Sequence, residues 1–92
     1  IWTEIGTIST RGFKTKMLMI INNNPTVPVN INIFGSLDNV NFDAVVDSNI
    51  SLGGGEKYLK DEPRIFTGIK IFAKANTGLS SNITIKAYMI NI

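Results

Sequence analysis

Much of the chain alternates apolar and polar residues, which is the pattern of β-strands that bury one face. The alternation is most regular from Val27 to Phe34, from Ile65 to Lys74 and from Ile83 to Met89. No segment carries the apolar stripe at i, i+3 and i+4, with capping residues, that is typical of an amphipathic helix. The pattern therefore predicts an all-β protein.

Less regular stretches complete the predicted set, and turn-forming clusters rich in Asn, Gly and Pro separate them. These further strands are expected at residues 2–9, 14–22, 40–46, 50–52 and 56–60. Seven or eight strands with turns every ~8–12 residues predict an antiparallel β-sandwich, jelly-roll-like in its winding. Pro28 cannot donate to a ladder, which predicts an edge position for its strand. Gly53-Gly54-Gly55 is expected at the tip of a hairpin, because no helix and no Gly-Lys-Ser/Thr follow it to make a phosphate loop.

The N-terminal segment 1–12 is expected to be an arm or an edge strand, attached to a single sandwich domain over residues 13–92. Gly6 weakens it as a strand, and the bend at Arg11-Gly12 would let it swing away from the domain. Such an arm would pair with the open sheet edge of a neighbouring copy. The residues predicted to make this contact are Ile1, Trp2, Ile5 and Ile8.

One stretch breaks the alternation, because Met17–Ile21 is apolar at every position. This pattern is typical of a strand that is covered on both faces, or of one that lies under a neighbouring subunit. We therefore expect it to be a central strand that is covered on both faces.

The 92-residue chain contains no histidine and no cysteine. This excludes imidazole bases, thiolate nucleophiles, disulfides and the usual zinc and haem ligand sets. The carboxylates show no pair whose environments would separate two pKa values, as acid–base catalysis requires. We therefore expect a protein that is not an enzyme and that binds no cofactor or metal.

The formal net charge is only +2, and the lysines are scattered among acidic residues. A nucleic-acid surface would gather them on one face among aromatic residues, so no nucleic-acid partner is expected. No apolar run approaches the ~20 residues of a membrane-spanning helix, so no membrane insertion is expected.

Two groups of residues are candidates for binding. Oxygen ligands for calcium could come from the cluster Asp38, Asn39, Asn41, Asp43 and Asp47. That spacing lacks the Gly and Glu of an EF-hand loop, and a solvated surface is the preferred interpretation. The aromatic residues either fill the core or form a platform for sugar rings. The candidate interface residues are Phe34, Phe66 and Phe72, expected opposite the aliphatic face, with Ile90 and Ile92 at the C-terminus.

Several short motifs between Lys16 and Ile92 carry a resemblance to a known family. They are Ser36-Leu37-Asp38-Asn39-Val40-Asn41-Phe42, Gly53-Gly54-Gly55, Tyr58-Leu59 and Arg64-Ile65-Phe66. With these motifs the chain resembles small β-sandwich domains of spore-forming Firmicutes and is similar to the jelly-roll subunits of endospore appendage fibres. The resemblance implies subunits that complete each other's sheets, with an N-terminal arm linking successive layers. Those subunits cross-link through arm cysteines, which this chain does not have.

The expected function is that of a non-enzymatic structural subunit. A small domain without disulfides gains stability from association, and the apolar residues near both ends would be buried by it. The expected partner is a second copy of the chain, in an extracellular, spore-surface or cell-surface fibre. The alternatives are a phage virion protein (a decoration or tail-fibre domain) and a module that binds a glycan or a host receptor.

Overall fold

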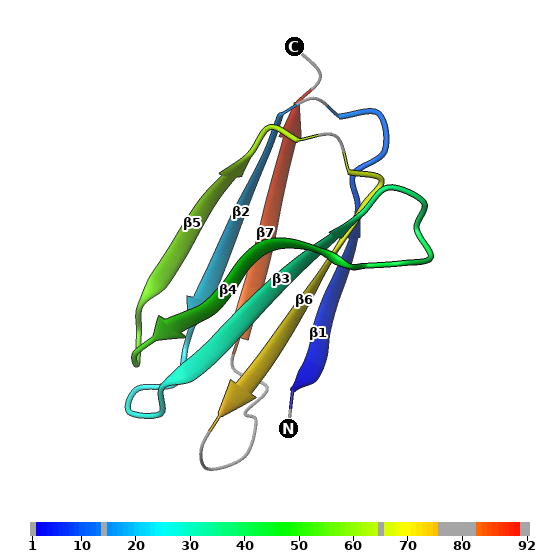
Figure 1. Ribbon diagram of the computed structural model, residues 1–92. Helices are drawn as coiled ribbons and strands as arrows, with labels where there is room; N and C mark the ends of the chain where they lie inside the picture. Colours follow the sequence, from blue (N-terminus) through cyan, green and yellow to red (C-terminus); the bar gives the residue numbers. More distant parts are fainter. Residues whose placement is uncertain (1, 14, 65, 76–82, 91–92) are drawn as a thin grey trace.

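The computed structural model describes residues 2–13, 15–64, 66–75 and 83–90. Seven strands form two antiparallel sheets that pack face to face (Figure 1). The strands are β1 (Thr3–Ser9), β2 (Thr15–Asn22), β3 (Val29–Ser36), β4 (Ala44–Leu52), β5 (Lys57–Glu62), β6 (Gly68–Ala75) and β7 (Ile83–Ile90). Sheet A has the order β1-β6-β3-β4 and sheet B the order β5-β2-β7. The predicted antiparallel β-sandwich is confirmed.

The strand pairings are nested one inside another. β3 pairs with β4, β2 with β5 and β1 with β6, each pair antiparallel. A long hairpin that is wrapped so that its two arms close two sheets is the winding of a jelly roll. β7 then adds to the remaining side of β2 and completes sheet B.

The core lies between the two sheets and is built from their alternating residues. Sheet B contributes Leu18 and Ile20, and sheet A contributes the aliphatic residues of β3 and β6, all of them buried. Those residues of sheet A are Val29, Ile31, Ile33, Ile69, Ile71 and Ala73. The alternation therefore predicts the buried faces of β3 and β6 correctly.

Three details of the prediction are wrong. The strand after Pro28 is not an edge strand: β3 begins at Val29, past the proline, and lies between β6 and β4. The two short strands expected at 40–46 and 50–52 are one strand, β4, whose register shifts locally where it pairs with β3. Gly53-Gly54-Gly55 is not a hairpin tip, since it joins β4 of sheet A to β5 of sheet B.

None of the residues that the structure describes belongs to a helix that could cross a bilayer.

Candidate functional site

The edge of β7 is the most regular open edge of the sandwich. β7 is the outermost strand of sheet B on one side, and its eight residues pair with β2 without any shift in register. It contains no Pro and no Gly, and Lys86 is its one charged residue. A long, regular and weakly charged edge strand is a template for pairing with another chain.

The direction of the backbone groups on β7 follows from the hydrogen bonds of β2. The N–H of Asn22 donates to the carbonyl of Glu56, at 3.0 Å, so the backbone groups of Asn22 point towards β5. Its Cα partner Ile83 therefore points its own N–H and C=O away from β2, because directly opposed antiparallel residues either both bond or both turn away. By alternation, the residues that present backbone groups to the open edge are Ile83, Ile85, Ala87 and Met89.

The other three open edges carry features that disfavour strand addition. β1 has a shift in register between Glu4 and Gly6. β4 has two such shifts, and Asn49 within it has a positive φ of 54°. β5 has only six residues, and four of them are charged: Lys57, Lys60, Asp61 and Glu62.

The side chains that close the sandwich between β1 and β7 are apolar and only half-buried. They are Ile5 and Ile8 of β1 and Ile83, Ile85 and Ala87 of β7, all packed against the core. The two strands approach closely at one point, where a Cβ atom on Gly6 would lie 2.9 Å from Cδ1 of Ile85. In Figure 1, β1 forms the margin of sheet A beyond β7. In the described part of the chain, sheet B has three strands against the four of sheet A, so this side of the sandwich is open.

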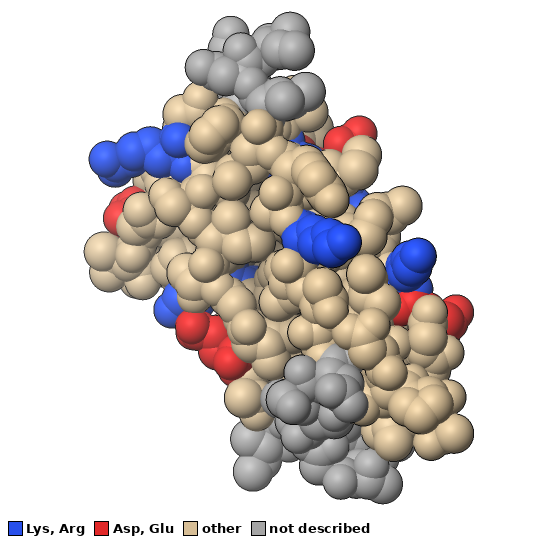
Figure 2. All heavy atoms as spheres, turned by 180° about the vertical axis from the view of Figure 1, so that it is seen from behind, with Lys and Arg blue, Asp and Glu red and all other residues tan. Residues whose placement is uncertain are grey.

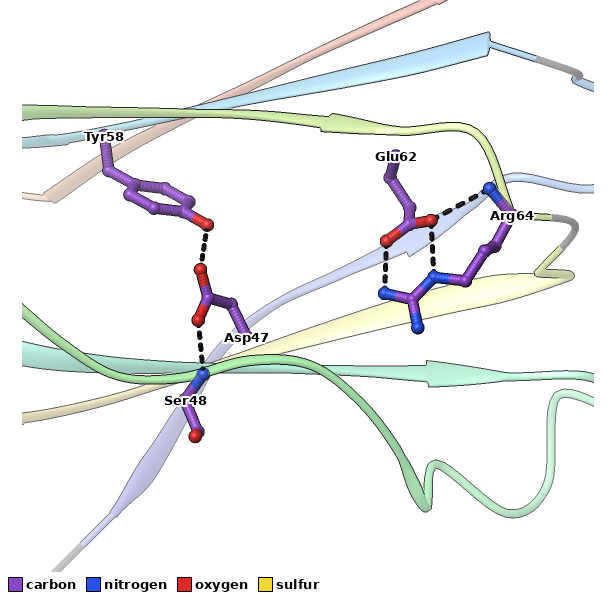
Figure 3. Close-up of polar contacts among 5 residues, drawn as sticks. All are labelled: Asp47, Ser48, Tyr58, Glu62 and Arg64. Atoms are coloured by element: carbon purple, nitrogen blue, oxygen red, sulfur yellow. Dashed lines mark hydrogen bonds and ion pairs between the residues drawn. The ribbon is translucent and has the colours of Figure 1, made fainter.

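The opposite side, between β4 and β5, is closed by polar groups (Figure 3). The hydroxyl of Tyr58 on β5 donates to Asp47 on β4 at 2.6 Å, and Asp47 also accepts the N–H of Ser48 at 2.9 Å. Burial and the adjacent Asp47 carboxylate raise the pKa of Tyr58, so the phenol stays protonated as the donor. A hydrogen bond thus joins the two sheets on this side.

An ion pair between buried Glu62 and exposed Arg64 lies at the end of β5. The Glu62 side chain is 1% exposed and accepts three hydrogen bonds from Arg64, from Nε, Nη2 and the backbone N–H. Burial by itself would raise the pKa of Glu62, but the hydrogen bonds from Arg64 outweigh it and lower the pKa. This pair sets the turn out of β5.

Asn22 ties three segments together at the other end of the same side. Its buried amide nitrogen donates to the carbonyls of Val27, Leu52 and Gly53 at 2.8, 3.2 and 3.1 Å. Its amide oxygen accepts from the backbone N–H and the side-chain amide of Asn24. Asn22 therefore fixes the connection between β4 and β5, a role that the turn-forming character of Asn alone did not reveal.

The outer face of sheet B is an apolar surface. β2 is the central strand of this sheet, as its composition predicts, but within one chain only its inner face is covered. Met17, Leu59 and Tyr88 are 39%, 58% and 55% exposed, and Met19 and Ile21 are half-buried between them. Figure 2 shows the molecule from behind, where uncharged residues cover most of the surface and charged side chains form small, scattered groups.

The predicted interface residues do not form one surface. Phe34 and Phe72 lie half-buried on the outer face of sheet A, with ring centroids 5.7 Å apart in an edge-to-face pair. Phe66 is wrongly predicted as an interface residue, because it is buried in the core. β6 begins only at Gly68, so the strand alternation does not extend back to Phe66, and its ring packs on Gly35. Ile90 ends β7, and Ile92 lies outside the described residues.

Two of the predicted arm residues, Ile5 and Ile8, belong to β1 in the single chain. Of the two alternatives for the N-terminal segment, this chain adopts the edge strand, paired with β6. Ile5 and Ile8 face the core, and the ammonium of Lys74 lies 5.0 Å from the ring centroid of Trp2. Ile1 lies outside the described residues.

The oxygen-rich cluster is not brought together around one point. Asp38 caps the loop after β3, accepting the N–H groups of Val40 and Asn41 at 2.8 Å each, and these bonds lower its pKa. Asp47 instead turns to Tyr58. Among the described residues, no three His, Cys, Asp or Glu side chains gather where they could hold a metal ion.

Comparison with known proteins gives no match, since no family model, no curated protein and no solved structure is significantly similar to this chain.

Proposed function

We propose that this chain is a non-enzymatic structural subunit that assembles with copies of itself by strand addition at the free edge of β7. The observation that carries the proposal is the contrast between this edge and the other three. β7 offers four consecutive edge-facing positions in perfect register, whereas the others are bulged, short or charged.

Strand addition at this edge would pair free backbone groups and cover half-buried apolar side chains. It would pair the backbone groups of Ile83, Ile85, Ala87 and Met89. It would also place a fourth strand in sheet B beneath β1, where Ile5 and Ile8 are half-buried. The donor strand comes from a neighbouring copy, and the setting is an extracellular or spore-surface fibre. A phage virion built on the same contact is the alternative setting.

A proline substitution tests the edge directly. The N–H of Ala87 points to the open edge, so Ala87→Pro should keep the ladder to β2 while removing a donor from the association edge. Lys86→Pro is the matched control, because the N–H of Lys86 bonds β2 and its loss should lower the stability of the monomer. Assembly is followed by negative-stain microscopy and light scattering.

Amide hydrogen exchange gives an independent readout for the unsubstituted protein. In the monomer, protection along β7 should alternate, with Thr84, Lys86 and Tyr88 protected and their neighbours exchanging fast. In the assembly the alternation in protection should disappear, because β7 is then paired along both of its edges. Assembly that proceeds unchanged in Ala87→Pro, or alternation that persists in the assembly, would contradict the proposal.

A second candidate function is glycan binding on the outer face of sheet A. The edge-to-face pair of Phe34 and Phe72 favours it, because aromatic side chains lie outside the core and next to the amides of β3. Chemical-shift mapping with oligosaccharides tests it: a ligand at this site should shift the signals of β3 and β6 and should lose affinity in Phe72→Ala.

A further inference from the structure

A second surface, separate from the β7 edge, is exposed and apolar at its centre. It is the outer face of sheet B, which consists of three rows of cross-strand neighbours. The rows are Lys57–Ile21–Thr84, Leu59–Met19–Lys86 and Asp61–Met17–Tyr88. The centre of this face is apolar, and its charges lie on the two edge strands.

The charges on β5 are placed symmetrically about the middle row. Lys57 and Asp61 stand two residues before and two residues after Leu59, on the same face, about 7 Å away on each side. Neither side chain makes an ion pair with any residue that the structure describes. A positive and a negative charge at equal distances from an apolar centre are self-complementary under a two-fold rotation.

We propose that two copies of the chain pack sheet B against sheet B about a two-fold axis that crosses the strands over Leu59 and Met19. Each β5 then runs antiparallel to β5 of the second copy, and Lys57 of each faces Asp61 of the other. Met17 of each copy faces Ile21 of the other, and the two Met19 side chains meet at the axis. Sheets packed this way lie about 10 Å apart, which suits interdigitated Met and Leu side chains.

The alternative two-fold axis, along the strands, is less complementary. It would lay β5 on β7 of the second copy, so Asp61 would face Tyr88 and Leu59 would face Lys86. Neither charge would then meet an opposite one. The crossing axis also brings the two Lys86 side chains into one row. Because β7 is an edge strand, each ammonium can reach solvent past the rim.

The size of the face sets the strength of the contact. Three strands and the eight residues of β2 span roughly 14 by 27 Å, which buries on the order of 800 Å² for the two copies together. Stable interfaces begin at about 1,200 Å², so this contact is weak by itself. It is suited to an array in which every copy is also held by other contacts.

The test uses the Ala87→Pro protein, so that failure of the β7 edge and failure of this face are distinguishable. Sedimentation equilibrium up to millimolar concentration should show a monomer–dimer equilibrium. Lys57→Glu and Asp61→Lys should each weaken dimerisation about tenfold, because each reverses two facing pairs in the dimer. An equimolar mixture of the two variants, and the double variant, should both restore the dimer.

Matched controls change the same charges elsewhere. Lys74→Glu on the outer face of sheet A and Asp43→Lys in the loop before β4 should leave the dimer unchanged. Lys86→Gln should tighten it by removing the facing like charges. A chain that stays monomeric at millimolar concentration, or a dimer that the mixture does not restore, would overturn the proposal.

Discussion

On the β4/β5 side of the sandwich, polar side chains join the two sheets, whereas on the β1/β7 side the described side chains that meet are apolar. The first side is held by the bond from Tyr58 to Asp47 and by the buried amide of Asn22. The second has half-buried aliphatic residues and the free backbone groups of β7. Directional bonds specify one closed arrangement, while apolar contacts leave room for a further strand. The closed side therefore stabilises the monomer, and the open side is the one on which the proposed assembly depends.

The largest loss of folding stability is expected from Asn22→Asp on the closed side. The substitution would set a carboxylate oxygen against the three carbonyls that now accept from the amide nitrogen. Unfolding in urea should show a loss of about 4 kcal/mol, the cost of several unsatisfied buried groups. Asn23→Asp is the control, since Asn23 is exposed and should cost under about 1 kcal/mol. Equal losses in the two variants would show that the Asn22 amide is not critical.

A pair of truncations compares the apolar residues of the two sides. Leu52 on β4 is buried, and Leu52→Ala should cost about 3 kcal/mol. Ile85 on β7 is half-buried, and Ile85→Ala should cost about 1 kcal/mol in the monomer. If the cost at Ile85 rises once the protein has assembled, the open side is covered by association. A cost at Ile85 that matches Leu52 in the monomer would mean that this side is already closed.

A smaller loss of folding stability is expected at the hydrogen bond that joins the two sheets. Tyr58→Phe keeps the ring and removes only the hydroxyl that donates to Asp47. The loss should be about 1 kcal/mol, and a double-mutant cycle with Asp47→Asn should show coupling of similar size. Additive effects of the two substitutions would contradict a direct interaction between the sheets here.

The smallest change in folding stability is expected from the protonation of Glu62 in acid. Its pKa is lowered in the folded protein, so the unfolded chain binds the proton first as the pH falls. The contribution of Glu62 is therefore complete above its ordinary pKa of 4.5 and is lost as the pH drops towards the lowered folded value. Urea midpoints of the parent and of Glu62→Gln should converge as the pH falls through this range. A difference that stays constant would show that Glu62 does not titrate with unfolding.

Alternation allowed the strand faces to be predicted but not the partners of the strands. It placed Ile69, Ile71 and Ala73 correctly in the core, because a period of two residues is a property of the strand itself. Alternation failed at Phe66, which precedes β6 and is buried in the core. The edge position predicted from Pro28 was also wrong, because the proline lies before the first residue of β3. Which strands are edges depends on contacts between distant segments, and these leave no local pattern.

One feature of the sequence indicated the exposed apolar face of sheet B. The unbroken apolar run Met17–Ile21 indicated a strand with a second face to cover, and the outer face of sheet B is that surface. Nothing in the sequence marked β7 as the open edge, because its alternation is as clean as that of the interior strands. The symmetric placement of Lys57 and Asp61 became visible only once β5 was known to pair with β2.

The nested pairing has a consequence for the time course of folding. The β3–β4 hairpin joins neighbours in sequence and can close early, the β2–β5 ladder must enclose it, and the β1–β6 ladder encloses both. Ladders that close larger loops form more slowly, so β1 docks late in refolding. During that interval the edge of β6 is unpaired and can accept β1 from another chain in competition with its own. Newly synthesised chains at high local concentration would therefore have a kinetic route to exchange their N-terminal strands, a route that folded monomers have lost.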